Sequence, residues 1–430
     1  MTTLHPNPAP RQPAAPDGPV GPVRTDGEAV DLDRWPAMAA PPDSRVRASL
    51  ARLLLRRAAR RTGIRVQLPD GSTFGPTDGA LLTVRDQRAF FTRLGRDGKV
   101  GLGEAYMAGD WDAPDLVAVL EPMARHLRAL VPSPFQHLRR FYDARQPSRE
   151  DNDRTGARRN IARHYDLSND LFATFLDETM TYSSALFADD DEQLADAQAR
   201  KVERLLDRAG VRAGSRVLEI GTGWGELAIR AARRGAHVTS VTISEAQATF
   251  ARARVAAAGL AQRIDVRIQD YRDVTGRYDA VLSVEMIEAV GPKWWPAYFR
   301  VLEQRLAPGG RVGLQAILMP HDVMLASRNS WTWIHKYIFP GGVIPSERAI
   351  DETLRAHTAL RTVERLHFGP SYAETLRRWR QRFVEQADRV AGLGFDETFR
   401  RMWVFYLAYC EAGFRAGHLD VAQLVLAREA

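Results

Sequence analysis

Short apolar runs alternate with segments of helical periodicity from about residue 215 onward. Apolar runs of roughly four to eight residues are typical of buried strands, and helices between them predict a parallel sheet covered on both faces. The expected strands are Arg216 to Ile220, His237 to Ile243, Ile264 to Gln269, Tyr278 to Glu285 and Gly310 to Ile317. The pattern therefore predicts an α/β fold. After Ser346 we expect the chain to be mainly helical.

Nearer the N-terminus, the stretch from Ser44 to Arg61 has apolar residues at helical spacing. One stripe of this helix would carry Leu50, Leu53, Leu54 and Ala58, and arginines such as Arg45, Arg52, Arg56 and Arg60 occupy its other faces. The pattern predicts a basic amphipathic helix. Such a helix either packs on its own domain or contacts lipid.

Composition suggests four segments. Residues 1–42 are rich in Pro, Ala and Gly and predict a disordered tail. Residues 43–130 carry turn signals between short apolar runs and predict a small N-terminal domain. Residues 131–159 are rich in Pro and Arg, which is typical of a linker, and residues 160–430 form the expected second, larger domain.

The net charge of +7 favours an anionic partner, either nucleic acid or a phospholipid surface. Cys410 is the only cysteine, so the 430-residue chain cannot form an internal disulfide, and we expect a reducing, cytoplasmic setting. The sequence has no run of 18 apolar residues, so no membrane-spanning helix is expected. No His and Cys cluster has the spacing of zinc ligands, so no metal site is expected.

A glycine-rich turn follows the first expected strand, with Glu219 at the strand end and glycines at Gly221, Gly223 and Gly225. Glycines permit positive φ angles and let a ligand approach the main chain closely. A dinucleotide-binding loop is one alternative, but it should have an acid at the end of the second strand. That strand instead ends in Val-Thr-Ile-Ser. The turn resembles the first motif of class I methyltransferases, which bind S-adenosylmethionine.

Further motifs occur in order around this loop: His164-Tyr165-Asp166-Leu167-Ser168-Asn169, Thr181-Tyr182-Ser183-Ser184-Ala185 and Gln269-Asp270-Tyr271-Arg272-Asp273. Together they resemble the cyclopropane-fatty-acyl-phospholipid synthase family over about residues 63–428. The resemblance implies a Rossmann-like class I methyltransferase sheet, a helical cover over an acyl tunnel and a small, lipid-associated N-terminal domain.

The resemblance also implies which residues bind S-adenosylmethionine. They are Tyr165, Tyr182, Ser183, Glu219, Gly221, Gly223, Trp224, Gly225, Thr242, Ile243, Gln247, Gln269, Asp270 and Tyr271.

An isolated alkene is a weak nucleophile, so methyl transfer to it needs close alignment in a dry pocket and leaves a carbocation that must lose a proton. The family commonly uses a bicarbonate ion near this cation. Of the residues that hold it, Glu288, Tyr372 and Ile317 remain here, whereas Ser184 replaces a cysteine and Gln315 and Ala289 replace histidines. These three replacements put the bicarbonate site in doubt.

Glu285 stands where the family usually has a glycine. We hypothesise that its carboxylate replaces bicarbonate as the base and that Gln315 and Tyr372 position it. If the chain turns helical after the fourth strand, Glu285 and Glu288 share one face. The alternatives are that bicarbonate is retained or that Glu285 only forms a salt bridge. The product is then a methylene branch or a cyclopropane ring, with a slight preference for the branch.

The expected partners are a phospholipid membrane surface and an unsaturated acyl chain. We expect the protein to be cytoplasmic and to associate peripherally with the inner face of the membrane. A homodimer and a reductase acting on the product are further expected partners. Two alternatives stay open: a catalytically silent binding protein, and a nucleic-acid methyltransferase. Against the latter, no Asn/Asp-Pro-Pro-Tyr/Phe motif follows the fourth strand, and no nucleic-acid partner is expected.

Overall fold

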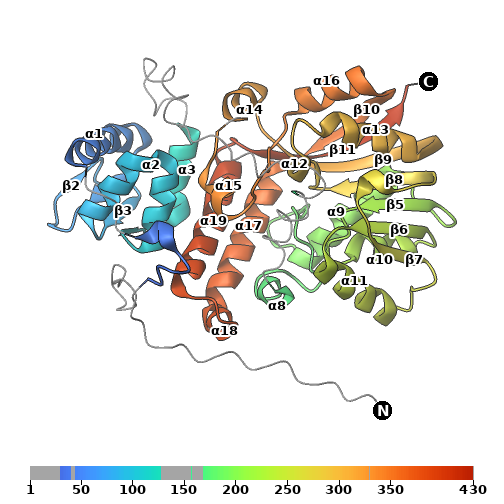
Figure 1. The fold of residues 1–430 in the computed structure, drawn as a ribbon, viewed down its shortest axis with the longest axis horizontal. Helices are drawn as coiled ribbons and strands as arrows, with labels where there is room; N and C mark the ends of the chain where they lie inside the picture. The colour runs from blue at the N-terminus through green and yellow to red at the C-terminus, as the bar shows by residue number, and fades with distance from the viewer. Residues whose placement is uncertain (1–29, 40–43, 127–155, 157–167, 329, 430) are drawn as a thin grey trace, which may run out of the picture.

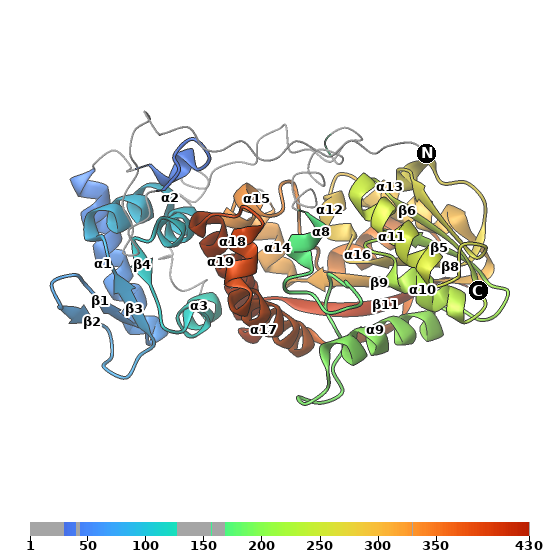
Figure 2. The ribbon, with the colours of Figure 1, turned by 90° about the horizontal axis from the view of Figure 1, so that it is seen from below.

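The computed structural model describes residues 30–39, 44–126, 156, 168–328 and 330–429. Within them a four-stranded sheet lies near the N-terminus and a seven-stranded sheet lies in the second part of the chain (Figure 1). Two long helices, α17 (Gly369–Glu385) and α19 (Glu397–Arg415), stand between the two sheets in both views (Figure 2). The molecule therefore has two sheet-containing parts joined through a helical layer.

The larger sheet has the strand order β10-β11-β9-β8-β5-β6-β7 and is parallel except for β11. Its strands are β5 (Arg216–Ile220), β6 (His237–Thr242), β7 (Ile264–Ile268), β8 (Tyr278–Val284), β9 (Leu306–Leu318), β10 (Leu360–His367) and β11 (Asp420–Arg428). The predicted Rossmann-like α/β fold is confirmed, as are all five predicted strands. The largest difference in bounds is at β9, which begins at Leu306 rather than Gly310.

Both faces of this sheet are buried because neighbouring strand residues point to opposite sides. Val217 belongs to one hydrophobic cluster and Leu218 to another. The first cluster lies under α9 (Leu194–Arg208), α10 (Glu226–Arg233) and α11 (Glu245–Ala257), and the second lies under α13 (Trp295–Arg305) and α16 (Glu347–His357). Apolar residues on both faces explain why these strands are continuous apolar runs in the sequence.

The strands β10 and β11 lie in the region that we expected to be mainly helical. The remaining described elements after Ser346 are helices, so that expectation holds except for these two strands. β10 is an edge strand with three of its eight residues exposed, and its alternating polar pattern is too weak to identify it. β11 is an apolar run, and its position between β9 and β10 depends on pairings far along the chain.

The N-terminal part pairs its strands in the order β2-β1-β3-β4. Its elements are η1 (Pro36–Met38), α1 (Arg45–Thr62), β1 (Arg65–Gln67), β2 (Thr73–Phe74), β3 (Leu81–Val84), α2 (Gln87–Ala108), β4 (Trp111–Asp112) and α3 (Leu116–Arg125). Residues 30–39, inside the stretch expected to be disordered, are packed instead: Met38 is fully buried, and its carbonyl accepts a hydrogen bond from the Arg93 guanidinium.

The predicted helix α1 is confirmed, but its buried stripe differs from the predicted apolar stripe. Ala51, Leu55 and Ala59 are buried, whereas Leu50 and Leu53 are exposed. The sequence left open whether this helix packs on its own domain or contacts lipid. The smaller alanines allow the close approach of α2, which packs against α1.

The two parts meet through direct polar contacts. The Arg401 guanidinium on α19 donates to the carbonyls of Tyr106 (2.6 Å) and Trp111 (3.0 Å). The buried Glu104 accepts from Lys336 and from the Tyr337 hydroxyl. The domain boundaries at residues 42, 130 and 159 stay predictions.

The short elements of the second part complete the description. They are α8 (Asn169–Phe172), η3 (Tyr271–Asp273), α12 (Ile287–Val290), α14 (His321–Ser327), α15 (Trp333–Tyr337) and α18 (Ala387–Gly392). Across the residues described, no helix has the length and apolar character needed to cross a bilayer.

Candidate active site

A cavity of about 1650 Å³ runs through the molecule beside the carboxyl ends of the central parallel strands. Its wall includes the glycine loop after β5, the end of β8 and residues of α19, and it extends to α1 in the N-terminal part. In an open parallel sheet, ligands bind at this edge of the strands. The cavity therefore joins the predicted cofactor loop to a distant apolar region.

The glycine loop has the backbone that a closely bound ligand requires. Gly221, Gly223 and Gly225 have φ angles of 97°, 51° and 91°, in the region that favours glycine. A Cβ atom on Gly221 would lie 2.8 Å from the Met286 Cγ atom. Gly221 and Gly223 line the cavity, whereas Gly225 is the cap residue immediately before α10. The loop thus leaves open main chain facing the cavity, which suits the methionine part of S-adenosylmethionine.

Glu219 is linked to the glycine loop through hydrogen bonds of buried side chains. It is buried, and its Oε2 atom accepts a hydrogen bond of 2.5 Å from the Ser240 hydroxyl, which lies 2.7 Å from the Thr222 hydroxyl. Burial raises the pKa of Glu219 to about 8. These contacts connect β5, β6 and the glycine loop.

The residues predicted to hold adenosine and ribose line the same cavity: Thr242, Ile243, Gln247, Gln269, Asp270 and Tyr271. The Thr242 hydroxyl donates to the Gln247 amide oxygen over 3.1 Å. Asp270 forms a two-pronged ion pair with Arg272, at 2.8 and 2.6 Å. These contacts fix the polar groups at the ends of β6 and β7.

Tyr182, Ser183 and Trp224 reach the cavity from other segments. The Tyr182 hydroxyl lies 2.8 Å from the Tyr406 hydroxyl, and the Trp224 indole donates to Asn169 over 2.9 Å. The remaining predicted cofactor residue, Tyr165, lies outside the described residues.

Glu285 is the centre of a set of hydrogen-bond donors in the cavity wall. Its Oε1 atom accepts from the Ser184 main-chain N–H (2.9 Å) and the Gln315 amide (2.8 Å), and its Oε2 atom accepts from the Tyr372 hydroxyl (2.7 Å). Ser184 and Gln315 do not line the cavity themselves, whereas Glu285 and Tyr372 do. The structure therefore brings four of the predicted catalytic residues together around one carboxylate.

The backbone at Glu285 is unusual for a residue with a side chain. Its φ angle is 50°, and its N–H donates to the Gln315 carbonyl over 2.8 Å. This left-handed conformation ends β8 before α12 begins at Ile287. The expectation that Glu285 and Glu288 share one helical face is therefore wrong, because only Glu288 belongs to the helix.

Glu288 nevertheless reaches the same cavity from α12. Its Oε1 atom accepts from the Ile317 N–H over 2.5 Å, and within the described residues its buried Oε2 atom has no hydrogen-bond partner. Burial, and next the nearby Glu285 carboxylate, raise the pKa of Glu288 to about 8. The cavity wall therefore holds two carboxylates close enough to influence each other, Glu285 and Glu288, and Glu288 has an oxygen without a partner in the described part of the chain.

Lys201 on α9 was not among the predicted site residues. It is 1% exposed, and its ammonium donates to the Ser183 hydroxyl over 2.7 Å. Burial lowers the pKa of Lys201 to about 8, and the Glu285 carboxylate is the main group that opposes this fall. Burial raises the pKa of Glu285, and Lys201 is the main group that opposes this rise. A lysine on the buried stripe of α9, between Ala197 and Leu205, is the sequence signal that could have identified it.

A second missed residue is Gln423 on β11. Its amide nitrogen lies 3.2 Å from the Gln315 amide oxygen and 2.9 Å from the Lys201 carbonyl, donating to both, and its own oxygen accepts from Arg204 over 2.7 Å. Because the Gln315 oxygen is occupied in this way, its NH2 group faces Glu285.

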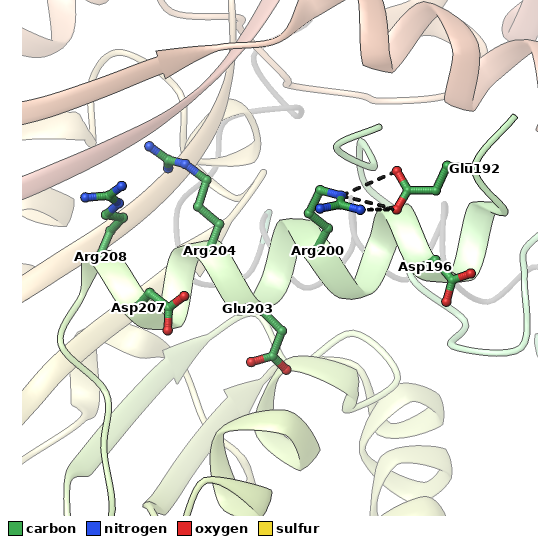
Figure 3. Close-up of a pocket in the computed structure, with 7 residues that line it drawn as sticks. All are labelled: Glu192, Asp196, Arg200, Glu203, Arg204, Asp207 and Arg208. Carbon is green, nitrogen blue, oxygen red and sulfur yellow. Dashed lines mark hydrogen bonds and ion pairs between the residues drawn. The ribbon is translucent and has the colours of Figure 1, made fainter. Parts of the chain in front are cut away.

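A separate charged pocket lies on the surface along α9. Figure 3 shows that Arg200, Arg204 and Arg208 lie on one side of this helix and Glu203 on another, and all four residues line the pocket.

Comparison with known proteins decides the family. The mycolic acid cyclopropane synthetase family matches residues 152–424. The chain belongs to this family. It is 53% identical over 418 residues to the tuberculostearic acid methyltransferase of Mycobacterium tuberculosis, covering 94% of this chain and 98% of that protein. It is 35% identical over 346 residues to the cyclopropane-fatty-acyl-phospholipid synthase of Escherichia coli, covering 79% and 86%.

Solved structures agree. The cyclopropane synthase MmaA2 from Mycobacterium tuberculosis matches with a TM-score of 0.60 and 30% identity, over 64% of this chain and all of that one. The mycolic acid cyclopropane synthase CmaA1, complexed with SAH and CTAB, matches with a TM-score of 0.58 and 28% identity, over 65% and 98%. The predicted family, fold and use of S-adenosylmethionine are confirmed: the protein is an S-adenosylmethionine-dependent methyltransferase that modifies lipids.

Proposed function

We propose that the protein methylates the cis double bond of unsaturated phospholipid acyl chains and that the Glu285 carboxylate is the base. One observation carries the proposal: a carboxylate held by three donors opens onto the cavity that also contains the glycine loop. The Ser184, Gln315 and Tyr372 donors would otherwise face the space of the family's bicarbonate ion. A bound bicarbonate is therefore not required in this proposal.

S-adenosylmethionine supplies an electrophilic methyl group. The chain's own residues must then align the alkene with it and exclude water. Leu376, Phe405 and Phe414 provide apolar cavity wall for a hydrocarbon. When the alkene carbon takes the methyl, the neighbouring carbon becomes a carbocation. A carboxylate about 4 Å away stabilises that charge by about 4 kcal/mol at an effective dielectric of about 20, roughly a thousandfold in rate.

The proton that leaves determines the product. If the new methyl loses a proton before any rearrangement, the carbon–carbon bond that closes a cyclopropane forms. If a hydride first moves to the cationic carbon, loss of the same proton gives a methylene branch. Burial raises the pKa of the Glu285 carboxylate, and Lys201 and the hydrogen bonds from Tyr372, Ser184 and Gln315 only partly oppose that rise. We propose that the hydride shift comes first, which gives the methylene-branched product.

One observation supports the branch. Identity to a relative named as a tuberculostearic acid methyltransferase is 53%, against 35% for one named as a cyclopropane synthase. A separate reductase would then reduce the methylene to a methyl group. We place the reaction at the inner face of the membrane, where phospholipid supplies the acyl chain, and a homodimer stays a prediction.

Mass spectrometry of lipids tests this proposal. Purified protein, S-adenosylmethionine and vesicles of oleoyl phospholipid should give acyl chains that gain one CH2 group, and fragmentation should place a methylene branch at the former double bond. Turnover should persist in buffer stripped of bicarbonate. Cyclopropane products, or a requirement for bicarbonate, would contradict the role of Glu285. Cofactor binding with no transfer, or methyl transfer to DNA or RNA, would overturn the proposed function.

A further inference from the structure

Helix α1 carries two apolar stripes, and only one of them is packed. Ala51, Leu55 and Ala59 are buried. Residues on the other stripe are exposed: Val46 is 81% exposed, Leu50 53%, Leu53 65% and Leu54 42%. At about 100° per residue, the centres of the two stripes lie on roughly opposite sides of the helix. A row of four large apolar side chains therefore faces outward from the N-terminal part.

Arginines flank this exposed stripe on both sides. The helix has the sequence RVRASLARLLLRRAARRT, with seven arginines and no acidic residue. On the helical wheel, Arg45, Arg56 and Arg60 lie on one side of the stripe and Arg47 lies on the other, while Arg57 and Arg61 continue its line toward the C-terminal end of the helix. An apolar strip bordered by cations is the pattern of a helix that lies in the interface of an anionic bilayer.

The cavity reaches the same stripe. Leu50 and Leu54 line it at one end, and Gly221 and Glu285 line it near the glycine loop. The stripe and the cavity therefore form one continuous apolar surface. α14 lines the cavity as well, through residues such as Val323, and its Leu325 is 45% exposed.

We propose that α1 docks the protein on an anionic phospholipid bilayer, with Val46, Leu50, Leu53 and Leu54 among the acyl chains and the arginines on lipid phosphates. An acyl chain can then pass from the bilayer into the cavity along Leu50 and Leu54. This inference rests on the proposed function for the identity of the lipid as substrate. A second copy of the chain suits the surface poorly because the arginines around the stripe would face the same arginines of the other copy. Nucleic acid would leave the apolar stripe in water.

Vesicle binding without turnover tests the docking surface. The double variant Val46→Ser/Leu53→Ser removes two exposed side chains that do not line the cavity. Binding to saturated phosphatidylglycerol and phosphatidylcholine vesicles, without S-adenosylmethionine, should weaken by at least roughly tenfold. The matched control is Val363→Ser/Val384→Ser, which alters two valines that are 57% and 46% exposed on β10 and α17, and it should bind as wild type.

Charge provides the second arm of the test. Wild-type binding to pure phosphatidylcholine should be weaker, and Arg57→Gln/Arg60→Gln should reduce binding to the anionic vesicles by about fivefold per charge. SAH affinity and the thermal midpoint should stay unchanged in every variant, which shows that the fold is intact. Wild-type vesicle binding by the α1 variant would overturn the inference. So would loss of a wild-type dimer in that variant, since the stripe would then be a contact between copies.

The two proposals fail in different ways. Protein that binds vesicles through α1 but adds no CH2 group to unsaturated lipid disproves the proposed function and leaves the docking surface intact. Protein that adds CH2 to detergent-dispersed phospholipid without binding vesicles disproves the docking surface alone.

Discussion

The two ends of the reaction centre are built in different ways. At the cofactor end, residues 219–225 are the end of one strand and the turn after it, and the main chain of this turn forms the wall of the cavity. At the carboxylate end, Ser184, Gln315 and Tyr372 come from three separate segments and converge on Glu285. The first end depends on backbone conformation and the second on side-chain convergence. Substitutions should therefore affect binding at one end and chemistry at the other.

The largest effect should come from Glu285→Gln. Removing a general base costs about a hundredfold to ten-thousandfold in rate. We expect kcat to fall by at least a hundredfold, while SAH affinity measured by calorimetry stays unchanged. Glu285→Gly should regain activity when bicarbonate is added, because it reopens the space that the side chain fills. A variant with wild-type turnover would show that another group takes the proton.

At the cofactor end, Gly221→Ala should weaken SAH binding by roughly tenfold or more. The new Cβ would be strained at a φ of 97° and would lie 2.8 Å from Met286. Gly214→Ala is a matched control with a φ of 81° and open space around its Cβ, so it shares the backbone strain but not the clash. Equal losses of SAH affinity in both variants would contradict a specific role for the loop.

Lys201→Met should change the pH dependence more than the affinity. Removing the ammonium removes the main opposition to the raised pKa of Glu285, so the carboxylate takes up its proton at higher pH. The acid limb of kcat should move to higher pH, with about a tenfold loss near neutrality. The other carboxyl groups acting on Lys201, Asp177 and Glu226, remain in both proteins. An unchanged profile would mean that Lys201 only supports packing.

The smallest effect should come from Gln423→Leu. The Gln315 amide would lose the contact that orients it, and a buried polar atom left without its partner costs about 1–3 kcal/mol of stability. We expect kcat to fall by about threefold with SAH affinity preserved. Glu364→Gln removes an outer ion pair of Arg204 and leaves Gln423 in place, so it serves as the control. If both variants keep wild-type kcat, Gln423 has no positioning role.

The sequence predicted most of what depends on local pattern. The five parallel strands β5 to β9 follow from apolar runs, and the glycine loop follows from three glycines after a strand. The carboxylate cluster was predicted only through the family resemblance, because no local pattern connects Glu285 with Tyr372. Gln423 and the edge strand β10 were missed because their roles depend on partners distant in the chain. The sequence predicted the apolar stripe on α1 that faces outward, but periodicity alone does not indicate whether such a stripe is packed or exposed.

The position of β11 has a consequence for how the enzyme forms. This strand is the last of the sheet in chain order, yet it lies between β9 and β10 and carries Gln423 against Gln315. Joining β9 to β11 closes a loop of about a hundred residues, and such distant pairings form slowly. Until that step, the carboxylate end of the reaction centre lacks its outer support. Agents that capture exposed strand edges during synthesis should therefore block maturation of this enzyme at a late stage.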